Sequence, residues 1–402
     1  MTRQKKLLMW TVWAVSLLQM IGTAMAPAMN IIKTSVFAQY PLSQIQTVMA
    51  MTGLVSPAIS LLSAELIRRG ILTKKSVVLT GLFTLSATGF LALVLHTQLW
   101  HIGLLSVLTG IASGCYLSTI LSIMVDRFTS QERQIVTGIQ SVFVNAGGFL
   151  ISVLGGFLAA WHWYGGYIIL LAGVPLGILA LLTLPKETRV RHRNVKGAAK
   201  SKFETDIFFY AVTVFVFMLF FGVINPNLAI HLASSGFKNP ALAGVITAIQ
   251  MAGGVVFGFV FPKLTRLLED RLLYVAYCML AAGLLMLSVF HSSIILMGVG
   301  VFLAGASLSL IGPHCVVACA RCVDNRTSAI ATSLVTGLAP GLGSFLSPVI
   351  FTNLTTALGG ESTSYRFQFV GLTVLACGIA LAVVMAVRRH GRWRTAGQDI
   401  SI

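Results

Sequence analysis

Twelve long apolar stretches, none of which contains an Asp or Glu, constrain this chain more than any other feature. They cover approximately residues 7–32, 43–64, 76–98, 101–125, 134–160, 163–185, 207–233, 239–262, 272–290, 293–320, 327–356 and 367–387. A helix that crosses a bilayer needs roughly 20 mostly apolar residues. In lipid, only helices and closed barrels satisfy their backbone hydrogen bonds. Because these stretches lack the alternation of barrel strands, we predict an all-α integral membrane protein with twelve transmembrane helices.

The composition excludes other broad classes of protein. Only 10% of the 402 residues are charged and 56% are hydrophobic, whereas a soluble domain carries about 25% charged residues. The net charge of +17 is high enough for a nucleic-acid binder, but the basic residues interrupt apolar stretches instead of forming a polar surface. The sequence has no Walker loop, nucleophile elbow or zinc-helix motif. We therefore expect no enzyme activity, no cofactor, no metal site and no nucleic-acid partner.

The basic residues predict the orientation in the membrane. Of the 28 Lys and Arg, 25 fall on the side of the N-terminus, and only Lys33, Lys238 and Arg366 are assigned to the loops on the other side. Cytoplasmic loops carry the excess of Lys and Arg, so both termini are expected in the cytoplasm. The short loops favour a multi-pass protein of a bacterial inner membrane.

The N-terminus allows a second interpretation. Basic residues precede an apolar run that passes through Ala24-Met25-Ala26, which is typical of a cleaved secretory signal. The run continues to Ile32, however, and cleavage would leave eleven helices. We therefore expect the first stretch to be retained.

The chain divides near its midpoint. A polar, basic segment at residues 186–206 separates six expected helices in 1–185 from six in 207–402. Weak repetition relates the halves, because Pro27 and Pro226 occupy matching helices at an offset of 199 residues. We predict two pseudo-symmetric six-helix bundles joined by a cytoplasmic linker.

This organisation resembles the major facilitator superfamily, and the helix 2–3 connection is similar to the family's G-x-x-x-D-R-x-G signature. Here Arg68 and Gly70 match, whereas Ser63 and Ile67 stand where the family has Gly and Asp. The resemblance implies a central cavity that opens alternately to each side. It also implies that charges at this cytoplasmic end act in gating, and Glu65 is close enough to substitute for the missing acid.

The expected fifth helix is similar to those of exporters in this family, which often show G-x8-G-x3-G-P-x2-G-G. Four of the six positions match, although Ile151-Ser152 replaces Gly-Pro. The alternative is generic packing of small residues in lipid. The candidate gating and conformational residues are Glu65, Arg68, Arg69, Asp126, Arg133, Gly138, Gly147, Gly155 and Gly156.

Polar residues deep in apolar helices are costly, so they are candidates for substrate binding. The stretch 207–233 is the most informative, because aromatic residues lead into Asn225-Pro226-Asn227. The candidate substrate-binding residues are Asn30, Lys33, Asn145, Phe217, Phe221, Asn225, Asn227, His231, Gln250 and His314.

Each polar candidate also has a structural alternative. Lys33 can extend to the membrane interface instead of attracting an anion. Asn145 and Gln250 can bond between helices, and His314 can be satisfied by a neighbour.

Because the apolar stretches contain no Asp or Glu, the sequence leaves open how transport is coupled to an energy source. Protons are a candidate partner, carried by edge groups such as Glu65 and Asp126, by His231 or His314, or by the substrate itself; the remaining alternative is a uniporter. We expect a secondary transporter, acting as a monomer, that exports a small amphipathic, neutral or anionic molecule as an antiporter. The alternatives are an uptake permease or uniporter for an organic anion or small nutrient, and a membrane sensor that transports nothing.

Overall fold

The computed structural model describes residues 3–185, 205–321 and 334–398, and no strand occurs in these ranges. The first group of elements comprises α1 (Arg3–Ser16), η1 (Leu17–Ala28), α2 (Met29–Ile31), η2 (Ile32–Val36), α3 (Leu42–Arg68), α4 (Lys74–Ala92), α5 (Leu99–Arg127), α6 (Ser130–Trp161), η3 (Gly165–Ala172) and α7 (Gly173–Thr183). The second comprises α8 (Thr205–Phe221), α9 (Ile224–Ser234), α10 (Pro240–Leu268), η4 (Glu269–Arg271), α11 (Leu272–Val289), α12 (Ile294–Arg321), η5 (Leu334–Leu338), α14 (Ala339–Ser347), η6 (Pro348–Thr352), α15 (Asn353–Ala357) and α16 (Thr363–Gln398).

These elements combine into twelve spans that are long and apolar enough to cross a membrane, in agreement with the prediction from sequence. Several spans are interrupted. The first, Lys5–Val36, contains a 3-10 segment and a non-helical residue, Met20. The seventh changes from α8 to α9 around Gly222-Val223, shortly before Pro226, which is tolerated because it lies in the first turn of α9.

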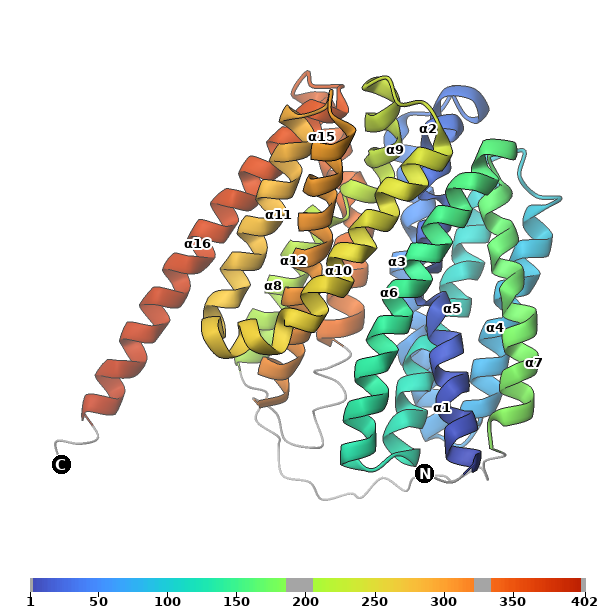
Figure 1. Ribbon diagram of the computed structural model, residues 1–402, viewed down its shortest axis with the longest axis horizontal. Helices are drawn as coiled ribbons and strands as arrows, with labels where there is room; N and C mark the ends of the chain where they lie inside the picture. Colours follow the sequence, from blue (N-terminus) through green and yellow to red (C-terminus); the bar gives the residue numbers. More distant parts are fainter. Residues whose placement is uncertain (1–2, 186–204, 322–333, 399–402) are drawn as a thin grey trace.

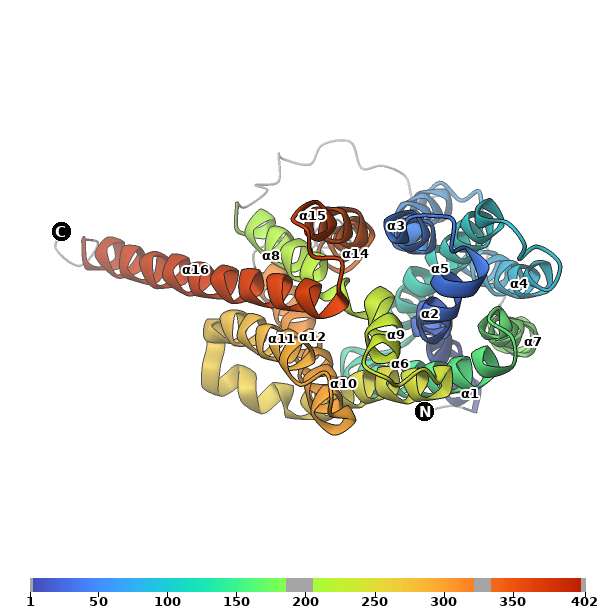
Figure 2. The same cartoon turned by 90° about the horizontal axis from the view of Figure 1, so that it is seen from above.

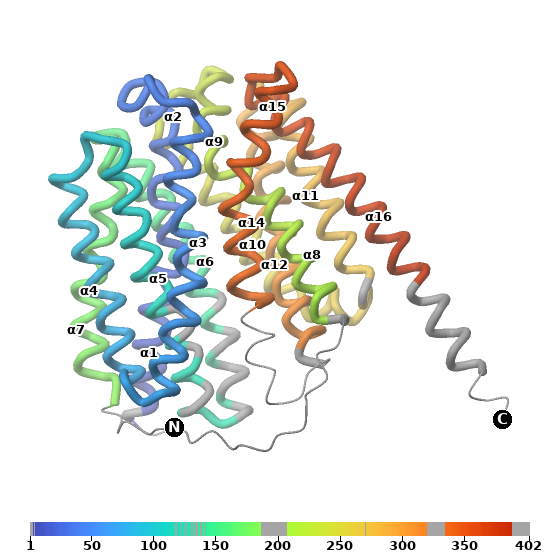
Figure 3. Tube along the Cα trace, turned by 180° about the vertical axis from the view of Figure 1, so that it is seen from behind, coloured from blue at the N-terminus to red at the C-terminus, as the bar shows by residue number. Residues whose placement is uncertain are grey.

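The spans form two bundles, α1–α7 and α8–α16, as predicted (Figures 1 and 2). We call the side on which α1 begins and α16 ends the terminal face, and the other side the opposite face. At the opposite face the bundles lie close together, whereas α16 slants away from the rest toward the terminal face (Figures 1 and 3). The predicted linker, 186–206, lies almost wholly outside the described residues, so the domain boundaries stay a prediction.

Glycines of α6 let it pack directly on the backbone of the first span. A Cβ atom on Gly147 would collide with the carbonyl oxygen of Leu17, and one on Gly155 would collide with the carbonyl oxygen of Ala24. Two of the glycines that the sequence singled out therefore lie at backbone contacts within the first bundle. In lipid such close approach replaces the hydrophobic effect as the source of helix association.

Two further close approaches join the bundles to each other. Gly156 of α6 faces Gly244 of α10, where a Cβ atom on either would lie 2.8 Å from the other's Cα. On the other side of the molecule, α14 lies beside α3 (Figure 3). Gly53 of α3 faces Gly341 of α14, and a Cβ atom on Gly53 would lie 3.2 Å from the carbonyl oxygen of Gly341. The bundles thus meet at two glycine crossings.

The contact of Gly147 with the first span predicts a loss of stability on substitution. We expect Gly147→Ala to lower the free energy of unfolding by about 1–3 kcal/mol, because the added methyl group must push two backbones apart. The measurement is the thermal unfolding of purified protein in detergent, followed by tryptophan fluorescence. The matched control is Gly258→Ala in α10, where a Cβ atom meets nothing within 4 Å. Equal melting temperatures for both variants would contradict the packing described here.

Candidate substrate cavity and polar gate

A cavity of about 140 Å³ lies between the bundles and is lined by both. Its walls come from the first span, α3, α5, η3 and the start of α9. The apolar part of the wall includes the side chains of Ile21, Met25, Met29, Met49 and Leu170. Such a wall suits the apolar body of a small molecule, and methionines adapt to different shapes.

The polar part of the wall contains amides and hydroxyls but no charged side chain. It consists of Gln46, Thr52, Ser106, Thr109, Tyr167 and Asn225. The cavity therefore offers hydrogen bonds without a fixed charge on its surface. This arrangement does not supply the counter-charge that an organic polycation needs.

Asn225 is one of the predicted binding residues and lines the cavity. It belongs to the first turn of α9, directly after the interruption of the seventh span. Its Oδ1 atom is buried and has no hydrogen-bond partner among the described residues. A buried amide without a partner is costly, so a bound molecule or water that hydrogen-bonds here gains free energy.

A set of hydrogen bonds between the bundles, which we call the polar gate, lies beside the cavity toward the opposite face. It consists of Gln46, Asn227, Thr352, Thr355 and Arg366. Gln46 of α3 is 1% exposed and places its amide against the second bundle. Its Nε2 donates to the carbonyl oxygen of Pro226 at 3.2 Å and to Oδ1 of Asn227 at 3.0 Å, and its Oε1 accepts from the Thr352 hydroxyl at 2.6 Å.

Asn227 extends this network into the second bundle. Its Nδ2 donates to the carbonyl oxygen of Val223 at 2.8 Å, which holds the side chain against its own helix. Its Oδ1 accepts from Gln46 and also from Nη1 of Arg366, at 2.6 Å. The structure thus places this predicted binding residue in the gate, and it is not among the residues that line the cavity.

Arg366 is the most unusual member of the gate. Its side chain is 1% exposed, and its Nε donates to the Thr355 hydroxyl at 3.1 Å. Among the described residues, no carboxylate pairs with it. Taking a cation out of water costs several kcal/mol, and here only an amide oxygen and a hydroxyl compensate.

Other predicted residues of the seventh span lie inside the second bundle. His231 is fully buried, with Nδ1 2.9 Å from the Thr363 hydroxyl and Nε2 2.9 Å from the Leu287 carbonyl oxygen. Phe217 and Phe221 are also buried and stack on each other. His231 thereby joins α9 to α11 and α16, and Phe217 packs edge-on against Tyr277 of α11.

Asn145 and Gln250 lie where α6 meets α10. A Cβ atom on Gly254 would lie 2.9 Å from Oδ1 of Asn145. Gln250 is 1% exposed, and neither atom of its amide has a hydrogen-bond partner among the described residues. His314 of α12 is 6% exposed. None of the three lines the cavity described above, so their roles in binding stay predictions.

Asn30 and Lys33 lie at the end of the first span, at the opposite face. Lys33 donates from Nζ to the carbonyl oxygens of Tyr40 at 2.9 Å and Ala38 at 3.5 Å. It thereby ties the end of the first span to the loop before α3. Asn30 is half-buried, and its backbone oxygen accepts from the Thr34 hydroxyl.

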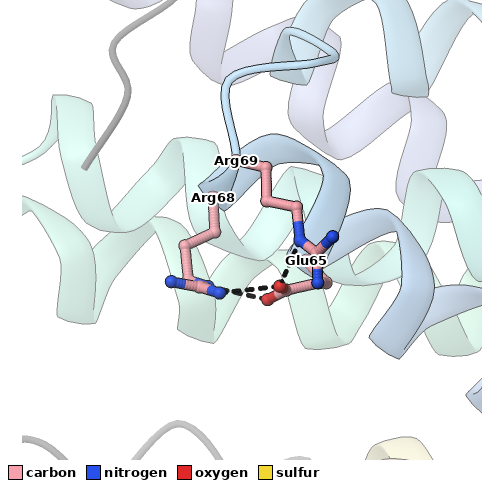
Figure 4. Close-up of polar contacts among 3 residues, drawn as sticks. All are labelled: Glu65, Arg68 and Arg69. Carbon is pink, nitrogen blue, oxygen red and sulfur yellow. Dashed lines mark hydrogen bonds and ion pairs between the residues drawn. The ribbon is translucent and has the colours of Figure 1, made fainter. Parts of the chain in front are cut away.

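At the terminal face, acidic residues pair with basic residues. Glu65 binds Arg68 at 2.6 Å and Arg69 at 2.7 Å, all at the end of α3 (Figure 4). Glu132 begins α6, where the Thr129 backbone N–H and the Lys5 ammonium 3.1 Å away lower the pKa of its carboxyl. The side chains of Asp126 and Arg133 and the surroundings of Gly138 are outside the described part of the structure, so the gating roles of these residues stay predictions.

Most of the polar gate has no clear signal in the sequence. The charge count places Arg366 in a loop, yet it is buried in the first turn of α16. Gln46, Thr352 and Thr355 do not stand out, because a single Gln or Thr in an apolar stretch is common. The available signal for Arg366 was its position directly before the last apolar stretch. In the described ranges, no group of three or more His, Cys, Asp or Glu is placed to hold a metal ion.

Comparisons with known proteins show which family and which solved structures this architecture is similar to. The family model described as the Major Facilitator Superfamily matches residues 11–336. The nucleoside transporter NupG has a similar structure, with a TM-score of 0.67 and 16% identity over 94% of this chain and 99% of that one. A peptide transporter POT gives a TM-score of 0.74 with 13% identity over 96% and 95% of the two chains. The POT family transporter PepTSo gives 0.74 with 10% identity over 95% and 98%. No curated protein sequence matches the chain.

The contacts of Gln46 predict that its removal weakens the polar gate. We expect Gln46→Ala to shift the equilibrium toward a conformation open at the opposite face, because three hydrogen bonds between the bundles, each worth about 1 kcal/mol, are lost. The measurement is the labelling rate of Ala26→Cys, a cavity position, by a membrane-impermeant maleimide added at the opposite face in a cysteine-free background. The labelling should become several-fold faster.

The matched control for this labelling is Gln44→Ala, two residues earlier in α3 and exposed. It should leave the rate unchanged. A rate that is equally slow in Gln46→Ala would show that these bonds do not keep the cavity closed.

Proposed function

Because the chain belongs to the Major Facilitator Superfamily, and is on that basis a membrane transporter and not an enzyme, we propose that it is a secondary active exporter of a small amphipathic molecule, neutral or anionic. The observation that carries this proposal is the cavity between the bundles, whose wall is uncharged and mostly apolar. Its closure at one face by hydrogen bonds between the bundles supports alternating access.

The orientation is part of the same proposal. The strong excess of Lys and Arg on the terminal face supports a cytoplasmic location of both termini. The polar gate then closes the cavity toward the outside, and the conformation described here is sealed against the external medium. We place the protein in the inner membrane as a monomer.

Proton antiport is the proposed source of energy, and the structure limits how protons can be carried. The apolar stretches contain no Asp or Glu, and both ring nitrogens of His231 are engaged by Thr363 and Leu287. The proposed carriers are therefore the edge group Glu65, the intramembrane His314, or an ionisable substrate. The missing intramembrane carboxylate also favours a second candidate function, a uniporter or uptake permease for an organic anion.

Flux in proteoliposomes tests the proposal. We expect the purified protein to move benzenesulfonate or its neutral analogue benzenesulfonamide across the bilayer, and to exclude a lipophilic dication, because the cavity wall offers no counter-charge. An imposed pH gradient should accelerate the flux if protons are exchanged. Transport that is indifferent to pH would contradict antiport and favour the uniporter.

The inactive control is the variant Gly156→Leu, at one of the two crossings between the bundles. A leucine there should obstruct the relative movement of α6 and α10 and abolish the flux, while a neutral substitution such as Gly258→Ala should preserve it. If no probe moves faster than in protein-free liposomes, the transporter proposal fails for this class of molecule.

A further inference from the structure

Two hydrogen-bond donors from opposite bundles converge on a single acceptor in the polar gate. Nε2 of Gln46 reaches Oδ1 of Asn227 at 3.0 Å, and Nη1 of Arg366 reaches the same oxygen at 2.6 Å. All three residues are 1% exposed. An amide oxygen carries only a partial negative charge, so it is a weak acceptor for a buried guanidinium.

The surroundings of Arg366 make its charge more costly still. The residue lies in the first turn of α16, where the positive end of the helix dipole disfavours a cation. Its other described partner, the Thr355 hydroxyl, is neutral. Because no carboxylate pairs with it in the described part of the chain and its place in the helix is unfavourable, this buried cation gains much from an incoming anion.

The cavity extends to the polar gate. Gln46, Asn225 and Pro226 all line it, and Asn227 follows directly in the chain. Rotation of the Asn225 amide about χ2 exchanges its oxygen and nitrogen, so the amide can present a donor. An acceptor group at this end of the cavity therefore meets the Asn225 amide and Gln46 first, and Arg366 lies one side chain beyond.

We propose that the polar gate is a recognition site for an organic anion, in which an anionic oxygen of the substrate replaces Oδ1 of Asn227 as the acceptor for Gln46 and Arg366. The apolar body of the substrate occupies the cavity against Met25, Met29 and Met49. This inference rests on the proposed transport function and narrows its substrate class from neutral or anionic to anionic.

The replacement couples binding to the closed state of the gate. Once the anion accepts from Gln46 and Arg366, it replaces the bond between Gln46 and Asn227 with a bridge between donors from opposite bundles. A neutral molecule can satisfy Gln46 but leaves Arg366 dependent on Asn227. Because a ligand shifts a conformational equilibrium only by its difference in affinity for the two states, the anion stabilises the closed gate more than its neutral analogue does.

Binding to the full-length protein in nanodiscs tests this inference without measuring transport. The probes are benzenesulfonate and benzenesulfonamide, which have nearly the same shape but differ in charge, and calorimetry gives both dissociation constants. Because hydrogen bonds to charged groups contribute about 1.5–3 kcal/mol, we expect the sulfonate to bind at least about tenfold more tightly. Binding of the sulfonate should also slow maleimide labelling of Ala26→Cys from the opposite face, because the anion bridges the gate and its apolar body fills the cavity that Ala26 lines.

Two substitutions should abolish the preference for the anion. Asn227→Asp keeps the size of the side chain but provides a permanent carboxylate partner for Arg366, and Arg366→Gln removes the charge. In both variants the ratio of the two dissociation constants should fall to about one. Lys238→Gln is the matched control, because it removes a cation from the exposed surface of the same face and should keep the ratio of the unmodified protein.

The outcomes separate this inference from the proposed function. If sulfonate and sulfonamide bind equally, or if Asn227→Asp retains the preference for the sulfonate, the anion site is refuted while flux of either probe still supports a transporter. If sodium chloride alone slows the labelling as much as the sulfonate does, the gate binds inorganic anions and the inference is wrong. Should Arg366→Gln fail to fold, the isosteric Asn227→Asp variant still decides the question.

Discussion

Helix association in lipid depends on contacts between backbones, because apolar side chains gain nothing by leaving a lipid for another apolar surface. This constraint explains why α6 packs on the first span through Gly147 and Gly155, and why the bundles meet at Gly156–Gly244 and Gly53–Gly341. It also makes a few polar bonds decisive. Where the bundles meet at the opposite face, the bonds of Gln46 to Pro226, Asn227 and Thr352 add directional contacts between surfaces that otherwise attract each other only through packing.

The polar gate contains one polar group that is well satisfied and one buried charge that is poorly compensated. Gln46 is well satisfied, since its amide donates and accepts at normal distances. Arg366 is not, since among the described residues its buried charge is bonded only by Asn227 and Thr355. An anion that enters from the cavity would offer Arg366 a stronger acceptor. The stability of the closed conformation therefore depends on what the cavity contains.

The helices could be predicted from sequence because a run of about 20 apolar residues is a local property. The cavity position of Asn225 was also within reach, since an Asn beside an intramembrane Pro is a local signal. The rest of the gate was not, because residues 46, 227, 352 and 366 are joined only by the tertiary fold. A charge count assigned Arg366 to a loop, since it records sequence position and not burial. The location of His231 could not be predicted either, because periodicity does not show which face of an apolar helix lines a cavity.

The two glycine crossings bear on the speed of conformational change. Where large side chains interlock, one helix can move past another only after those side chains have changed rotamer, and each change adds to the activation barrier. At Gly156–Gly244 the backbones meet with no side chain between them, and at Gly53–Gly341 the closest side chain is the ring of Pro57. The helices can roll against each other there with little rearrangement. The activation barrier to movement of the bundles is then set mainly by breaking a few hydrogen bonds. The polar contacts at one face of the membrane therefore determine the rate of the conformational change.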